Sequence, residues 1–283
     1  MKIGILVDSS SGLTNETTKN TNIEVLPLHI LVENTKDYLD TQEIKTEFKI
    51  YDQIKNKVHV TTSQASPGEL TEKYEKMLKK YDHIIHLSIP SNLSGMFQTS
   101  VMVSKMDEFA GRVTVLNHFL AANILAKIAF KFNEMVKNEN IQIEDFQKEI
   151  DEWSKNSLLY LIPSDYSSLA KGGRAKSVLL SVLKLFKTKL AIQWEEKPRK
   201  GGISRTITGL IEKLYDAIVT KFKEKFKLLL VYTEVVSQKL IETIREKMNL
   251  KKINYQEEIL PTSFACHAGL DTVAIIAYKE ELE

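Results

Sequence analysis

The stretch Leu87–Gln98, L-S-I-P-S-N-L-S-G-M-F-Q, is the feature around which the rest of the chain is organised. It follows an apolar run and ends in a helical pattern, so it predicts a strand, a tight turn and a helix. Gly95 has no Cβ atom, which would let backbone amides approach a ligand closely at the turn. The first amides of a helix carry partial positive charge, which suits an anion. Ser94 is therefore either a donor to a carboxylate or phosphate, or a helix-capping serine.

Two more hydroxyl-rich turns occur in the first half of the chain. A strand over residues 2–7 leads into Asp8–Ser11, and Thr61–Ser63 precedes a predicted helix start, S-P-G-E at Ser66–Glu69. That start has the serine and glutamate of a capping box, with proline at the first helical position. Because strands and helices alternate along the chain, we expect a mostly parallel sheet. The three polar turns would then lie at one edge of it, where α/β proteins bind ligands.

The length of 283 residues predicts two domains, which we place at residues 1–156 and 157–283. In the second half, Lys197–Gly202 is predicted as a turn after a strand, and Cys266–Gly269 as a polar turn between the last two strands. The apolar stretches Phe119–Phe132 and Val178–Phe186 are either ordinary core or the wall of an apolar tunnel.

Composition narrows the class of protein further. The formal net charge of +2 gives no reason to expect nucleic acid as a partner. A single cysteine excludes an internal disulfide and fits a reducing cytoplasm, which is the location we expect. No apolar run approaches the roughly 20 residues that span a bilayer.

Enzyme chemistry finds little support in the motifs. The serine in N-L-S-G-M does not match the G-x-S-x-G elbow of serine hydrolases. Cys266 and His267 are adjacent in sequence, so in an extended loop their side chains would point apart. No phosphate-binding glycine loop and no zinc-type spacing is present, so we expect no cofactor and no metal. The remaining hydroxyl groups suit an anion that is held without reacting.

Five motifs make the chain resemble the DegV family of fatty-acid-binding proteins, which act as the lipid-carrying subunit of bacterial fatty acid kinase. They are I-L-V-D-S-S at 5–10, T-T-S-Q-A-S-P-G-E at 61–69, L-S-I-P-S-N-L-S-G-M-F-Q at 87–98, L-A-K-G-G-R at 169–174 and H-A-G at 267–269. The two middle motifs are long and specific. The resemblance implies a two-domain α/β fold, with a mostly parallel sheet in the N-terminal domain and a mixed sheet in the C-terminal domain.

The resemblance also implies a ligand, a partner and a set of site residues. A long-chain fatty acid would be buried, with its carboxylate held by Thr62 and Ser94. Ser63 and Gly95 stand beside these two residues in the motifs, and His267 matches the family's late histidine. A separate kinase subunit would phosphorylate the bound carboxylate to an acyl phosphate, and contact with the membrane would be transient.

Two arginines are candidates for contact with phosphate or with the partner. Arg205 is the nearest match to an arginine that assists with phosphate in the family, and Arg174 lies in the basic turn Lys171–Lys176.

Three departures from the family pattern bear on the phosphoryl-transfer role. The late motif continues as Leu270-Asp271 where the family usually has P-G, Asn117 and His118 replace an aspartate and a serine, and Ile203 replaces a lysine. We therefore expect lipid binding to be better preserved than the relay of phosphate. The alternatives are a small ester or phosphate hydrolase using Ser94 with His267, and a regulatory protein that senses lipid without a kinase.

Overall fold

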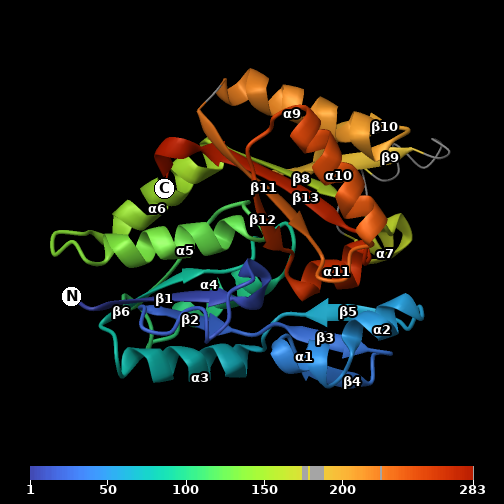
Figure 1. Ribbon diagram of the computed structural model, residues 1–283. Helices are drawn as coiled ribbons and strands as arrows, with labels where there is room; N and C mark the ends of the chain where they lie inside the picture. The colour runs from blue at the N-terminus through green and yellow to red at the C-terminus, as the bar shows by residue number, and fades with distance from the viewer. Residues whose placement is uncertain (174–177, 179–187, 224, 283) are drawn as a thin grey trace. The chain divides into compact units, whose positions relative to one another are not determined.

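The computed structural model describes residues 1–173, 178, 188–223 and 225–282, and the chain forms two compact units (Figure 1). The first unit comprises Met1–Ile50 and Val58–Lys155, and the second comprises Tyr51–Lys57 and Asn156–Glu283. The short segment Tyr51–Lys57 is therefore part of the second unit, although the residues before and after it in the sequence belong to the first.

The first unit is built on a four-stranded parallel sheet with the strand order β2-β1-β6-β7. Its strands are β1 (Ile3–Asp8), β2 (Ile23–Leu26), β6 (His83–Leu87) and β7 (Val113–Val115). Every residue of β1 and β6 is buried. Continuous burial is typical of central parallel strands, which are covered on both faces.

Pro27 divides the apolar run that follows β1. The residues before it form β2, at the edge of the parallel sheet, where a proline interrupts no ladder. The residues after it form β3 (His29–Val32), the middle strand of a separate antiparallel sheet with β4 (Lys36–Leu39) and β5 (Val60–Ser63). One apolar run therefore supplies strands to two sheets.

Helices cover both faces of the parallel sheet. The helices α3 (Pro67–Leu78) and α4 (Met96–Ser104) pack together over β6 and β7. On the other face, α5 (Ile124–Met135) packs on β1, β2 and α6 (Ile143–Lys155), and it buries Ile128 and Phe132. Two short helices, α1 (Gln42–Thr46) and α2 (Ile50–Lys55), lie between β4 and β5 in the sequence, and α2 belongs, apart from Ile50, to the second unit.

The second unit contains a six-stranded mixed sheet with the strand order β10-β9-β8-β13-β11-β12. The strands are β8 (Ser157–Ile162), β9 (Lys189–Trp194), β10 (Arg199–Ser204), β11 (Phe226–Tyr232), β12 (Gln256–Ile259) and β13 (Val273–Lys279). Neighbouring strands are antiparallel, apart from the parallel pair β11–β12. The α/β class, with one parallel and one mixed sheet, is confirmed.

Besides most of α2, four helices of the described residues after Asn156 belong to this unit. They are α7 (Tyr166–Lys171), α9 (Ile207–Phe222), α10 (Gln238–Leu250) and α11 (Thr262–Ala268). The long helices α9 and α10 pack on one face of the sheet, where Ile218 and Ile244 are fully buried among β-strand side chains (Figure 1). The apolar stretch Val178–Phe186 lies, apart from Val178, outside the described residues. Among the described helices, none combines the length and the apolar composition that a bilayer-spanning segment requires.

Candidate functional site

The turn after β1 is closed by the side chain of Asp8. Its Oδ1 atom accepts hydrogen bonds from the Ser10 amide (3.0 Å) and the Ser10 hydroxyl, and its Oδ2 atom accepts one from the Ile89 amide (2.5 Å). Asp8 is 1% exposed, and the three serines that follow it are also buried. Burial raises the pKa of the Asp8 carboxyl, against the opposing effect of these hydrogen bonds. Both carboxylate oxygens of Asp8 therefore already accept hydrogen bonds from the protein.

A second carboxylate lies behind the same turn. The Ser9 hydroxyl donates to Asp40 Oδ2 at 2.8 Å and accepts from the Leu28 amide at 3.0 Å. Burial, together with the negative charge of Asp8, raises the pKa of Asp40 to about 6. These bonds join the end of β1 to the residue that follows β4.

The turn after β6 is less fully satisfied. The amides of Leu93 and Ser94 donate to the Pro90 carbonyl, and Ser94 Oγ accepts a hydrogen bond from the Met96 amide at 3.2 Å. Ser94 is partly exposed, and its hydroxyl hydrogen has no acceptor among the described residues. Gly95 is the N-cap of α4, a helix of nine residues. Ser94 therefore retains one donor at the positive end of a helix.

The sequence predicted that Gly95 makes room for a ligand, but the group nearest to it in the structure is the side chain of Gln64. A Cβ atom placed on Gly95 would lie 2.5 Å from Gln64 Oε1. Gln64 Nε2 also donates to the Thr99 hydroxyl in α4, at 2.6 Å. The side-chain amide of Gln64 therefore lies against the start of α4. No role for this glutamine of the T-T-S-Q motif was predicted from the sequence.

Thr62 and Ser63 occupy a strand where the sequence predicted a turn. They pair with Ile30 and His29 of β3 in the antiparallel sheet. The expectation that all three polar turns share one edge of the parallel sheet is therefore wrong for Thr61–Ser63, because Pro27 starts a second sheet before β5 is reached. Thr62 is partly exposed, and Ser63 is exposed.

The capping box at Ser66 and Glu69 is confirmed. The Glu69 amide donates to Ser66 Oγ at 3.2 Å, and the Ser66 amide donates to Glu69 Oε2 at 2.8 Å. Glu69 Oε1 also lies 2.9 Å from His29 Nε2, while His29 Nδ1 lies 2.8 Å from Asp37 Oδ1. Burial opposes protonation of His29, but these two carboxylates raise its pKa overall. The start of α3 is thus fastened to the antiparallel sheet.

His118 is a supporting residue that the sequence did not assign. It is 4% exposed; its Nδ1 accepts from the Leu120 amide (3.2 Å), so its Nε2 carries the hydrogen that it donates to the Ser88 carbonyl (2.9 Å). Burial lowers the pKa of His118 to about 4, so the ring is neutral at pH 7. Its bond fixes the backbone just before Ile89, which binds Asp8.

His267 belongs to the second unit and lies in α11, where a turn was predicted. It is partly exposed. The helix ends at Gly269, whose φ of 93° favours glycine and where a Cβ atom would collide with Ser164 Oγ. The amides of Ser164 and Asp165 donate to the Ala268 carbonyl at 2.9 and 2.8 Å. The glycine of H-A-G is therefore required by close backbone packing.

Of the two arginines predicted to contact phosphate or the partner, only Arg205 lies among the described residues. Arg205 is exposed in the link between β10 and α9, one residue before the N-cap Thr206. Arg174 lies outside the described residues.

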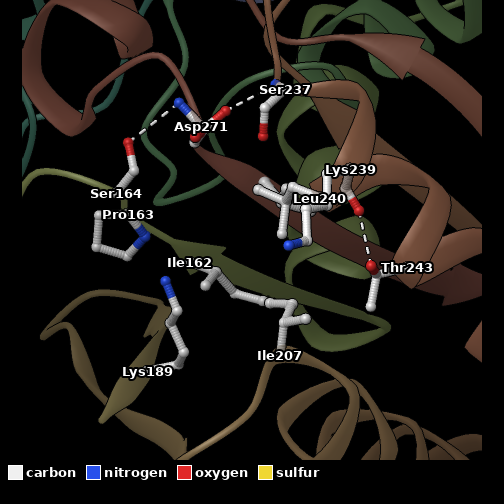
Figure 2. A pocket seen from close by; sticks show the side chains of 11 residues that line it. Ile162, Pro163, Ser164, Lys189, Ile207, Ser237, Lys239, Leu240, Thr243 and Asp271 are labelled. Atoms are coloured by element: carbon white, nitrogen blue, oxygen red, sulfur yellow. Dashed lines mark hydrogen bonds between the residues drawn. The ribbon is translucent and has the colours of Figure 1, made fainter. Parts of the chain in front are cut away.

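A pocket of about 430 Å³ lies within the second unit, between the end of β8 and the first turn of α10 (Figure 2). Figure 2 shows Asp271 at its rim, where the Asp271 amide donates to Ser164 Oγ (3.1 Å) and the Ser237 amide donates to Asp271 Oδ1 (2.7 Å). Lys189 and Lys239 also line the pocket. None of the described site residues predicted from sequence lines it.

The described part of the chain holds no group of three or more histidine, cysteine, aspartate or glutamate side chains placed to bind a metal ion.

Comparison with known proteins supplies the family. The profile described as "Uncharacterised protein, DegV family" matches residues 2–280. A DegV domain-containing protein of Mycoplasmopsis pulmonis is 27% identical over 288 residues, covering 99% of this chain and 96% of that protein.

Several solved structures are similar in fold, and two of them illustrate the likeness. A DegV family protein from Thermus thermophilus, described by its fatty acid binding, has a TM-score of 0.86 at 22% identity and covers 99% of this chain and 100% of its own. A stearic-acid-binding protein from Eubacterium ventriosum has a TM-score of 0.83 at 16% identity, with 98% of both chains covered.

Proposed function

Because the chain belongs to the DegV family, we propose that it binds a long-chain fatty acid without catalysing a reaction, and presents the carboxylate to a separate kinase. The family match over residues 2–280 carries this proposal, since fatty acid binding is described for the Thermus thermophilus member. The expected location in the cytoplasm and the transient contact with membranes belong to the same proposal.

The carboxylate is proposed to bind at the start of α4. Ser94 has a hydroxyl hydrogen free for an acceptor, and the first amides of α4 favour negative charge. A hydrogen bond to a charged group contributes roughly 1.5–3 kcal/mol. Thr62 is proposed as the second donor, from the end of β5, with Ser63 and Gly95 forming the adjoining backbone.

The acyl chain would supply most of the affinity. Each buried methylene contributes roughly 0.8 kcal/mol, so ten would contribute about 8 kcal/mol before the chain's ordering cost is subtracted. The polar groups would then fix the orientation of the ligand rather than its overall strength of binding.

Mass spectrometry of the organic extract of the purified protein tests lipid binding. We expect about one fatty acid per chain, and recovery of no fatty acid at any ratio would contradict the proposal. Turnover of generic esters that is lost in Ser94→Ala would support the hydrolase alternative instead.

The kinase role needs its own experiment, because it rests on the family resemblance. With lipid bound, a fatty acid kinase catalytic subunit and ATP should form acyl phosphate on the wild-type protein. His267→Ala should reduce this reaction more than it reduces fatty acid affinity, and Arg205→Ala should reduce it without changing affinity. Equal losses of binding and phosphorylation in His267→Ala would reject this division of roles, and no acyl phosphate with wild type would favour a lipid sensor.

A further inference from the structure

We propose that Gln64 is a positioning residue for the carboxylate site, because its amide ties the strand that carries Thr62 to the helix start that carries Ser94. The inference rests on the proposed function, since it concerns how that ligand is held. It gives Gln64 a role of its own at the site, beside the proposed donors Thr62 and Ser94.

The first observation is the link between Gln64 and α4. Gln64 comes directly after β5, two residues after Thr62, and its Nε2 donates to Thr99 Oγ1 at 2.6 Å. Thr99 lies in the first half of α4, and its amide donates to the Gly95 carbonyl at 3.0 Å. One side chain therefore joins the two segments that bear the proposed donors. β5 belongs to the antiparallel sheet and α4 packs on the parallel one, so no ladder holds them together.

The second observation is the contact between Gln64 and Gly95. The Gly95 φ of −68° is accessible to any residue, so the backbone conformation does not require glycine here. What requires it is Gln64 Oε1, which would lie 2.5 Å from a Cβ atom at this position. A larger residue at 95 would push the amide away from Thr99. The glycine in L-S-G thus makes room for Gln64.

This assignment changes how the glycine should respond to mutation. If Gly95 served the close approach of a ligand, Gly95→Ala would remain harmful whatever stands at position 64. If Gly95 serves Gln64, removing the glutamine side chain removes the clash. The double variant Gln64→Ala/Gly95→Ala would then be no worse than Gln64→Ala alone.

The experiment compares binding of hexadecanoate and hexadecan-1-ol, because a positioning role concerns the head group. Gln64→Ala and Thr99→Val should each lower hexadecanoate affinity about fivefold to tenfold, which corresponds to one lost hydrogen bond, with alcohol affinity unchanged. Gly95→Ala should give a similar loss, and the double variant should match Gln64→Ala. Gln98→Ala is the control, since Gln98 is an exposed neighbour on the same helix.

The outcomes separate the inference from the function on which it rests. Wild-type affinity for the acid with no change in either Gln64→Ala or Thr99→Val would overturn the role of Gln64 alone. Equal losses for acid and alcohol would also overturn it, because they would indicate general loosening of the fold. A double variant that is several times weaker than Gln64→Ala would return Gly95 to a direct role at the ligand. Wild-type protein that binds neither probe would overturn the proposed function itself. Thermal unfolding of each variant identifies any that fails to fold, in which case Thr99→Val, which keeps the shape of the side chain, decides the question.

Discussion

The ends of β1 and β6 are neighbours in one parallel sheet, and each leads into a turn rich in hydroxyl groups. After β1, Asp8 and its serines are buried, and both carboxylate oxygens accept hydrogen bonds. After β6, Ser94 is partly exposed and accepts a bond from Met96 while keeping its own hydrogen available. The comparison teaches that similar composition marks both turns, but the state of their hydrogen bonds separates a structural turn from a candidate site.

The largest expected effect is on the stability of the β1 turn. Asp8→Ala removes the acceptor of three hydrogen bonds and leaves the Ile89 amide buried without a partner. We expect the free energy of unfolding to fall by about 2–4 kcal/mol, measured by urea denaturation. Asp107→Asn changes an exposed carboxylate and should have an effect within about 0.5 kcal/mol. Equal unfolding midpoints for Asp8→Ala and Asp107→Asn would contradict the structural role that we assign to the β1 turn.

The next largest effect concerns ligand binding at the β6 turn. Ser94→Ala should weaken hexadecanoate binding about tenfold and lower the free energy of unfolding by only about 0.5–1 kcal/mol, because the Met96 amide loses the acceptor that Ser94 Oγ supplies. Thr62→Ala should act in the same direction. Titration calorimetry and urea denaturation measure the two quantities. Ser104→Ala, at the other end of α4, is the matched control and should leave affinity unchanged. Unchanged affinity in both site variants would remove Thr62 and Ser94 from the proposed site.

The smallest effect is a pH dependence that originates behind the β1 turn. The pKa of Asp40 is raised to about 6 in the folded protein, against 3.8 for an unperturbed carboxyl, so the folded state binds the proton more tightly. This contribution to stability is therefore present below about pH 4 and is lost as the pH rises through 6. Because Asp40 is partly exposed and solvent screens its charge, we expect this contribution to amount to less than about 1 kcal/mol.

Asp40→Asn tests the pH prediction by difference. Subtracting the unfolding free energies of Asp40→Asn from those of the wild type between pH 4 and 7 should isolate this slope, because the other titrating groups are common to both proteins. Parallel curves for the two proteins would show that Asp40 titrates normally.

Local patterns in the sequence predicted much of the fold because their causes are local. The capping box at Ser66 depends on residues three apart, and the buried strand β6 depends on a run of apolar side chains. The family, too, followed from short motifs, and it is confirmed by the match over residues 2–280.

Other elements could not be predicted, because their causes are distant in sequence. Lys197–Gly202 was predicted as a turn, yet Arg199–Ser204 forms β10, where Gly201 packs against the ring of Tyr160. Cys266–Gly269 was also predicted as a turn, but it belongs to helix α11, whose end is fixed by Ser164 and Asp165. In both cases the partner lies more than thirty residues away.

The family, the α/β class and the hydroxyl groups available for an anion could all be predicted from the sequence, because composition, periodicity and motif spacing are properties of the linear chain. Which of those hydroxyl groups already form hydrogen bonds within the protein depends on the folded structure. It buried Asp8 against the Ile89 amide, placed Thr62 in a second sheet and laid Gln64 across the start of α4. The physical reason is that a hydrogen bond needs a partner at about 3 Å, and folding alone brings distant partners that close.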